Sequence, residues 1–187
     1  QQSQRVKNFM NYQLMDQMKE YEPEFDQMLF NLPLAGSTFK KIYYDELMQR
    51  AVSKFVPADD IVVPYTATSL DDCESIIHRV RMTENELRKQ QVAGFYRDIE
   101  VNPRDDRMFS ILECHVDIDL EGFEDIGQDG QPTGIKIPYI VTLEEGTRKI
   151  LSIRRNYEVG DPMKKKINYF VHFKFLPGLG FYGFGLI

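Results

Sequence analysis

The sequence predicts an α+β fold, in which N-terminal helices precede a largely antiparallel β-sheet or open barrel with one short inserted helix. Three observations support this fold class. Apolar residues recur at helical spacing near the N-terminus, whereas apolar and polar residues alternate in short runs along the last third. Strand-like and helix-like segments also do not alternate along the chain, which argues against a doubly wound parallel sheet.

The composition restricts the classes of function. The chain has 187 residues, which suits one domain or one domain with an appendage. Its formal net charge of −6 restricts any contact with nucleic acid to local patches. No run reaches the roughly 18 apolar residues of a membrane span, so no membrane contact is expected. Cys73 and Cys114 lack metal-binding spacing, and we expect both thiols to be reduced.

Two helices are predicted at the N-terminus. The first runs from about Arg5 to about Glu20, and its apolar stripe contains Val6, Phe9, Met10, Leu14, Met18 and Tyr21. The second begins near Pro23, which suits a first helical turn, and buries Phe25, Met28 and Leu29. The segment Asn31-Leu32-Pro33 is expected to end it, because the residue before a proline disfavours helical geometry. Residues 34–37 then form a turn.

The middle of the chain combines strands with one short helix. Two strands are predicted over residues 38–44 and 51–56, joined as a hairpin by a short loop through Asp45, and a further strand over 75–82. A short extended piece at 61–63 lies between two prolines, so we expect it to be peripheral or irregular. Thr83 and Glu86 resemble a capping box, in which each side chain binds the backbone N–H of the other residue. The helix that they start should end near Val92, because Gly94 occupies the usual position after a C-cap.

The last third is predicted to be a β-meander. Its strands cover residues 109–120, 134–143, 149–157 and 167–175, and Glu145-Gly146-Thr147 fits a tight hairpin. From Pro177 onward, glycine alternates with large apolar residues. We expect these glycines to supply positive φ or close backbone approach, and the rings to supply burial against a partner. The chain also begins without methionine and ends on apolar residues, so we expect it to be a piece of a larger protein.

An acidic cluster is the strongest candidate for a metal site. Asp117, Asp119 and Glu121 alternate, so a strand through them would place three carboxylates on one face. The cluster also begins like a calcium loop, but Gln128 stands where that loop requires a glutamate. A solvated strand face that leads into an acidic loop is therefore favoured. A metal-dependent nuclease or hydrolase that uses these three carboxylates remains the alternative function.

The remaining candidates for chemistry are weak. His78, His115 and His172 each lie in an apolar-rich strand, where a structural histidine is the common outcome. Cys114 and His115 are adjacent, so in a strand they point to opposite faces and cannot form a catalytic dyad. The sequence has no phosphate-binding loop, nucleophile elbow or paired-histidine zinc helix. We therefore expect no catalytic residue, no cofactor and no enzymatic activity.

Four segments carry a resemblance to a known family. They are Leu32-Pro33-Leu34-Ala35-Gly36-Ser37-Thr38-Phe39-Lys40-Lys41-Ile42-Tyr43-Tyr44-Asp45, Val52-Ser53-Lys54-Phe55-Val56-Pro57-Ala58-Asp59-Asp60, Gln91-Val92-Ala93-Gly94-Phe95-Tyr96-Arg97-Asp98 and Phe175-Leu176-Pro177-Gly178-Leu179-Gly180-Phe181-Tyr182-Gly183-Phe184-Gly185-Leu186. Together they resemble the portal (head-to-tail connector) proteins of tailed bacteriophages, in particular the large portal family of short-tailed phages. The glycine-rich last segment is the most specific of the four.

The resemblance implies a structural role in a virion. A portal protein forms a homo-oligomeric ring of about twelve subunits at one capsid vertex. DNA passes through the ring without sequence specificity, and the capsid protein, the terminase and tail or adaptor proteins attach to it. Assembly takes place in the host cytoplasm. The resemblance also implies that residues 1–33 form a helical segment that joins the ring body, and that residues 34–187 form a wing-like α+β domain.

Residues that contact neighbouring subunits can be proposed from their patterns. The candidates are the stripe of the first helix, Phe9, Met10, Leu14 and Met18, and the terminal aromatic residues Phe181, Tyr182 and Phe184. Packing within the core of the chain explains either set equally well at the level of sequence.

Overall fold

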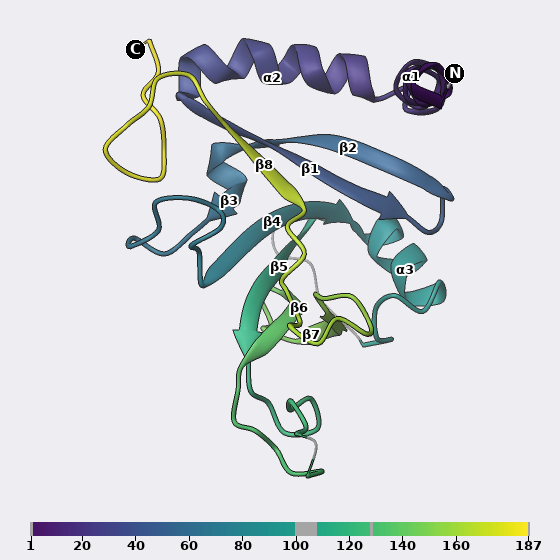
Figure 1. Ribbon diagram of the computed structural model, residues 1–187, viewed down its shortest axis with the longest axis vertical. Helices are drawn as coiled ribbons and strands as arrows, with labels where there is room; N and C mark the ends of the chain where they lie inside the picture. The colour runs from purple at the N-terminus through teal and green to yellow at the C-terminus, as the bar shows by residue number, and fades with distance from the viewer. Residues whose placement is uncertain (1, 100–107, 128, 187) are drawn as a thin grey trace. The chain divides into compact units, whose positions relative to one another are not determined.

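The computed structural model of the chain describes residues 2–99, 108–127 and 129–186, so the predicted role of Gln128 lies outside the described residues. Helices and antiparallel sheets are both present, which confirms the α+β class (Figure 1). The chain forms two compact units. The first comprises Gln1–Asp59, Ala67–Asp71 and Asn168–Ile187, and the second comprises Asp60–Thr66 and Asp72–Ile167. This division differs from the predicted boundary after residue 33, which falls inside a helix.

The first unit begins with the two predicted helices, but the first is shorter and the second is longer than the sequence predicts. Helix α1 spans Gln2–Tyr12 and continues as a π-helical turn, η1, over Gln13–Gln17. Met18 then leaves helical geometry while its N–H donates to the carbonyl of Gln13 at 2.9 Å. The helix predicted over 5–20 therefore ends early, because this wide turn redirects the chain into helix α2, Tyr21–Ala35.

The predicted end of the second helix was wrong. Helix α2 continues through Pro33 to Ala35, so the first two residues of the turn predicted at 34–37 are helical and the last one, Ser37, begins the next strand. A proline this near the end removes only one backbone donor of the helix. Gly36 then closes the helix in the left-handed conformation, with φ of 74° and its N–H on the carbonyl of Leu32 at 2.9 Å.

A three-stranded antiparallel sheet completes the first unit. Strands β1 (Ser37–Asp45) and β2 (Arg50–Pro57) form the predicted hairpin, and β8 (Phe170–Lys174) pairs with the other edge of β1. The prediction that this last strand closes the C-terminal meander was therefore wrong. Alternation predicts that a segment is a strand but does not select its partner. Helix α2 packs against β1 and β2 and buries Met28, whereas the predicted core residue Leu29 is exposed.

The second unit is built on a five-stranded antiparallel sheet in the order β3-β4-β5-β6-β7. The strands are β3 (Ile61–Val62), β4 (Ser75–Thr83), β5 (Met108–Ile118), β6 (Ile137–Glu144) and β7 (Ile150–Arg155). A 3-10 turn, η2 (Ala58–Asp60), precedes β3. The core of the unit joins Leu87, Phe109, Ile111 and Leu151. The two separate sheets replace the single sheet or open barrel that the sequence predicts.

Helix α3, Glu84–Val92, forms as predicted. The backbone N–H of Thr83 donates to Glu86 Oε2 at 2.7 Å, and the N–H of Glu86 donates to Thr83 Oγ1 at 3.3 Å. Both halves of the capping box are therefore made. Gly94 follows the C-cap residue with φ of 80°, a conformation that glycine adopts without strain.

The capping box gives a direct test of this local structure. Thr83→Ala should destabilise α3 by about 1 kcal/mol, because the third backbone N–H of the helix loses its acceptor. Amide hydrogen exchange across residues 84–92, followed by mass spectrometry, measures the effect. Thr83→Ser keeps the hydroxyl oxygen and serves as the control. Equal protection in Thr83→Ala and in the unmodified chain would contradict the prediction.

Candidate subunit interface

The glycine-rich residues 176–186, here called the terminal segment, fold back on themselves and onto the junction between α2 and β1. Leu176 and Phe184 form an isolated antiparallel bridge, in which the N–H of Phe184 donates to the carbonyl of Leu176 at 2.8 Å. The N–H of Gly183 donates to Ser37 Oγ at 2.8 Å, and the N–H of Leu186 donates to the carbonyl of Pro33 at 2.8 Å. The partner that the sequence requires for this segment therefore lies within the same unit.

The glycines of the terminal segment serve close backbone approach. A Cβ added at Gly183 would lie 2.6 Å from the carbonyl oxygen of Gly36, and one added at Gly185 would lie 2.5 Å from that of Leu34. Neither glycine has a positive φ. Of the two roles that the sequence allows, the structure thus selects close approach for these two glycines.

An aromatic stack holds the terminal segment against β1 and β8. The ring of His172 lies between Phe39, with centroids 4.4 Å apart, and Phe181, with centroids 4.7 Å apart. The side chain of Phe181 is only 5% exposed. Phe181, one of the predicted subunit contacts, is therefore part of the core of its own unit. Tyr182 and Phe184 are 42% and 60% exposed and stay available to a neighbour.

Ser37 joins three parts of the first unit. Its buried Oγ accepts the N–H of Gly183 and lies 3.0 Å from Nε2 of His172. Burial lowers the pKa of His172 from its ordinary value of 6.5 to about 4, and the charge of Lys174 adds to this effect. The imidazole is therefore neutral near pH 7. With its proton on Nδ1, the imidazole can accept a hydrogen bond at Nε2 from the hydroxyl of Ser37.

The predicted stripe of the first helix is divided by the structure. All side chains of α1 are exposed, with Phe9 at 59% and Met10 at 53%. Leu14, in η1, is half-buried, and Met18 is buried in the first unit. Met18 therefore contributes to the core, whereas Phe9 and Met10 present apolar surface to solvent. Large exposed apolar groups that lie together are typical of interaction sites.

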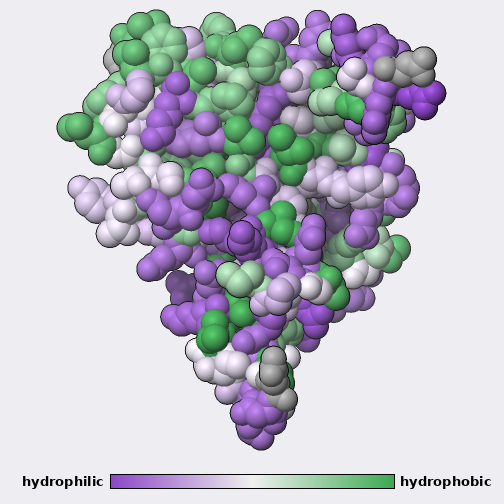
Figure 2. Space-filling view, viewed as in Figure 1, coloured by the Kyte–Doolittle hydropathy of each residue, from purple (hydrophilic) through white to green (hydrophobic). Residues whose placement is uncertain are grey.

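A second exposed apolar group lies at the carboxyl end of α2. Figure 2 shows hydrophobic residues gathered over this end of the helix and over the terminal segment, at the upper left of the view. We call this group the apolar patch, and its members are Phe30, Leu34, Leu179, Phe184 and Leu186. Phe30 is 73% exposed although it lies within a helix that is packed against a sheet. The apolar patch and α1 are thus the two candidate contact surfaces of the first unit.

Two interactions that sequence reasoning missed fix α2 on the sheet. The side chain of Lys40 is 4% exposed, and its Nζ lies 4.2 Å from the ring centroid of Tyr21. Burial lowers the pKa of this amine. Arg50 binds both carboxylate oxygens of Glu20, at 2.6 and 2.9 Å. One sequence feature could have indicated the buried lysine. Lys40 shares a strand face with Thr38, and the preceding helix is rich in aromatic residues.

The acidic cluster does not form the predicted strand face. Strand β5 ends at Ile118, and Glu121 and Gly122 lie in a turn in which the N–H of Phe123 donates to the carbonyl of Leu120. Asp117, Asp119 and Glu121 therefore do not lie along one strand, and the period-two argument for a shared face fails. Within the described residues, no group of three or more histidine, cysteine or acidic side chains has the geometry of a metal site.

The histidine and cysteine predictions agree with the geometry around β5. His115 is buried, and its Nε2 lies 2.7 Å from Oε1 of Glu113 on the same strand face. Cys114 is only half-buried and belongs to the opposite face, so it forms no dyad with His115. Burial raises the pKa of the Cys73 and Cys114 thiols, and neither cysteine forms a disulfide. A raised pKa leaves less reactive thiolate at neutral pH.

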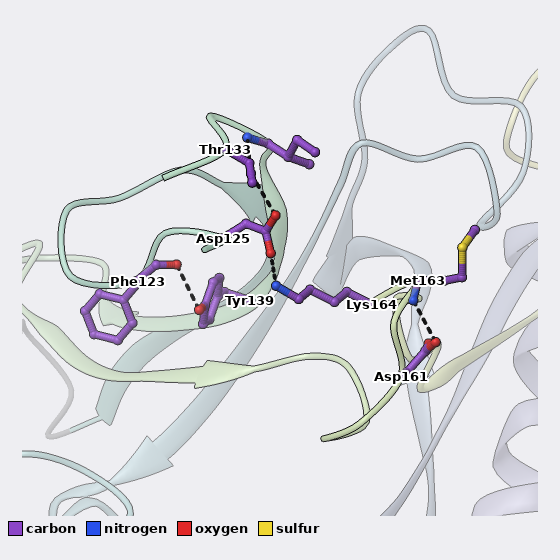
Figure 3. Close-up of polar contacts among 8 residues, drawn as sticks. Phe123, Asp125, Thr133, Tyr139, Asp161, Met163 and Lys164 are labelled. Carbon is purple, nitrogen blue, oxygen red and sulfur yellow. Dashed lines mark hydrogen bonds and ion pairs between the residues drawn. The ribbon is translucent and has the colours of Figure 1, made fainter. Parts of the chain in front are cut away.

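The second unit contains a cleft of about 750 Å³ between two of its loops. The lining includes Phe123, Tyr139, Arg155, Tyr157 and Lys164. Figure 3 shows that the polar groups of this cleft bind one another. Lys164 forms an ion pair with Asp125, and Thr133 Oγ1 donates to the other oxygen of this carboxylate at 2.7 Å. The hydroxyl of Tyr139 donates to the carbonyl of Phe123 at 3.0 Å. This network fastens the two loops together.

Comparison with known proteins does not place the chain in a family. No family model matches the chain, and no curated protein matches it either. Among the helices that the structure describes, none combines the length and apolar character needed to cross a bilayer.

The close approach of the terminal segment can be tested with a matched pair of variants. Gly183→Ala should destabilise the first unit by about 1–3 kcal/mol, because its Cβ would overlap a backbone oxygen. Gly180→Ala adds the same methyl group in open space and should stay within about 0.5 kcal/mol of the unmodified chain. Urea denaturation measures both. Equal unfolding midpoints for the two variants would contradict the proposed packing.

The burial of His172 predicts a pH dependence. The unfolded ring binds a proton below about pH 6.5, but the folded ring does so only near pH 4. The first unit should therefore lose roughly 1–2 kcal/mol of stability as the pH falls from 6.5 through 4, after allowance for partial exposure of the ring. Two-dimensional NMR of the imidazole protons measures the pKa directly. In His172→Phe this loss of stability at low pH should disappear. A measured pKa near 6.5 for His172 in the unmodified chain would contradict the prediction.

Proposed function

We propose that this chain is a structural subunit of a bacteriophage portal ring. The ring would occupy one vertex of the capsid in the virion, and it would assemble in the host cytoplasm. Its partners would be further copies of the chain, the capsid protein, the terminase, tail or adaptor proteins, and DNA that passes through without sequence-specific contacts. In this proposal the chain has no catalytic role and needs no cofactor.

The observation that carries the proposal is the exposure of apolar side chains on α1. An isolated helix of this length is only marginally stable in water, because the free energy needed to form its first turn exceeds the gain from its few hydrogen bonds. The exposed Phe9 and Met10 add apolar surface that a neighbouring subunit could cover. A subunit of a ring needs such a surface on the side that meets its neighbour.

Two further features support the same proposal. The four segments that resemble portal proteins are spread over most of the chain, and the terminal one makes the close packing at the α2–β1 junction. The net charge of −6 also suits a conduit for DNA. A protein that neutralised many phosphates along the channel would bind DNA strongly and impede its movement.

Electron microscopy of the gene product that contains this chain tests the proposal. The expected result is closed rings with rotational symmetry and a central hole, at about twelve subunits per ring. Mass photometry of the same sample should give a mass that matches the ring. Only monomers or dimers at high micromolar concentration, both alone and after co-expression with the phage capsid protein, would overturn the proposal.

A further inference from the structure

We propose that neighbouring copies of this chain meet head to tail, with α1 of one copy lying parallel to α2 of the next. This inference rests on the ring proposed above, and it names the surface on each side of the contact. The two helices belong to the same unit but do not lie side by side within one chain. Figure 1 shows α1 nearly end-on beside the start of α2.

Helix α1 has one basic, apolar face. Val6, Phe9 and Met10 lie within one arc of the helix, and Arg5 lies on the same arc one turn before Phe9. The opposite side carries Gln4, Asn8 and Asn11. The charged residues of α1 are Arg5 and Lys7, and the helix has no acidic residue. Any partner that covers this face should therefore be apolar and acidic.

Helix α2 presents such a surface. Glu22, Asp26, Phe30 and Leu34 follow one another at intervals of four, and all four are exposed. They therefore form one ridge along the helix, on a different side from the buried Met28. The charged residues of α2 are Glu22, Glu24 and Asp26, and the helix has no basic residue. The first half of the ridge is acidic, and the second half belongs to the apolar patch.

The order of residues along the two helices decides their relative direction. Arg5 and Phe9 are four residues apart, as are Asp26 and Phe30, and this spacing corresponds to about 6 Å along either axis. Parallel helices therefore place Arg5 opposite Asp26 when Phe9 is opposite Phe30. Antiparallel helices that pair Arg5 with Asp26 would place Phe9 against Glu22. Only the parallel arrangement satisfies both the charges and the apolar groups.

The same contact cannot form within one chain without unfolding part of the first unit. Met18 is buried, and Arg50 of β2 holds Glu20 through two hydrogen bonds, so the connection between α1 and α2 is anchored. The complementary surfaces are therefore available to another copy. Because the two surfaces differ, each copy keeps one of each kind free. Repeated contacts of this type form a ring when the rotation between copies closes, and an open filament when it does not.

Exchange of the two charges tests the pairing. Arg5→Asp and Asp26→Arg should each weaken association roughly tenfold, because each places like charges opposite one another. The double variant Arg5→Asp/Asp26→Arg should restore association to within roughly threefold of the unmodified chain. Sedimentation velocity over a concentration series measures this. Lys7→Asp makes the same charge change on the flank of α1 and is the matched control, with little expected effect.

Cysteine cross-linking tests the geometry independently. A chain with Phe9→Cys, mixed with a chain with Phe30→Cys, should form a disulfide-linked dimer under mild oxidation. Each variant alone should remain at the background given by Cys73 and Cys114. Circular dichroism checks that both variants fold, which we expect because both positions are exposed.

The other outcomes each give a decision. Equal dimerisation of Phe9→Cys alone would indicate a symmetric α1–α1 contact and would overturn the head-to-tail arrangement. An intramolecular disulfide in Phe9→Cys/Phe30→Cys, or no cross-link together with no effect of the charge variants, would also overturn it. Rings without the cross-link would leave the portal proposal standing and refute this contact. A cross-link without closed rings would support the contact and refute the proposed function.

Discussion

The first unit depends on β1 holding two strands that lie far apart in the sequence. Strand β2 follows β1 through a short turn, but β8 arrives only after the whole second unit. Its pairing with β1 places His172 against Phe39 and delivers the terminal segment to Gly36 and Ser37. Closing so long a loop costs entropy before any contact forms. The support of α2 at its carboxyl end therefore depends on residues from the far end of the chain.

Local patterns predicted most elements of the fold, because each element here is specified by neighbours in sequence. The capping box at Thr83, the hairpin of β1 and β2 and the peripheral strand at Ile61 were all predicted. The partner of β8 was not, since alternation carries no information about pairing. The continuation of α2 through Pro33 was also missed. The helix ends where Gly36 caps it, and the N–H of Leu186 in the terminal segment binds the carbonyl of Pro33.

The candidate interface was predicted only in part, and burial explains the division. Phe9, Phe181 and Phe184 are equivalent in sequence, since each is an aromatic residue in an apolar pattern. The structure buries Phe181 in a ring stack and leaves Phe9 and Phe184 exposed. Lys40 shows the opposite error, because a lysine is expected at the surface and this one lies under α2. In each case tertiary contacts, which sequence spacing does not contain, decided the outcome.

The separation of charge between α1 and α2 links the folding of α1 to assembly. Arg5 on α1 and Asp26 on α2 are complementary, yet the anchored connection at Glu20 keeps the two helices of one chain apart. In a monomer α1 has little tertiary support, so its helical state is marginal. Docking onto the next copy would supply the missing burial and charge partner at once. Ordering of α1 and association of the subunits then become one equilibrium, in which each added subunit stabilises the helix that holds it.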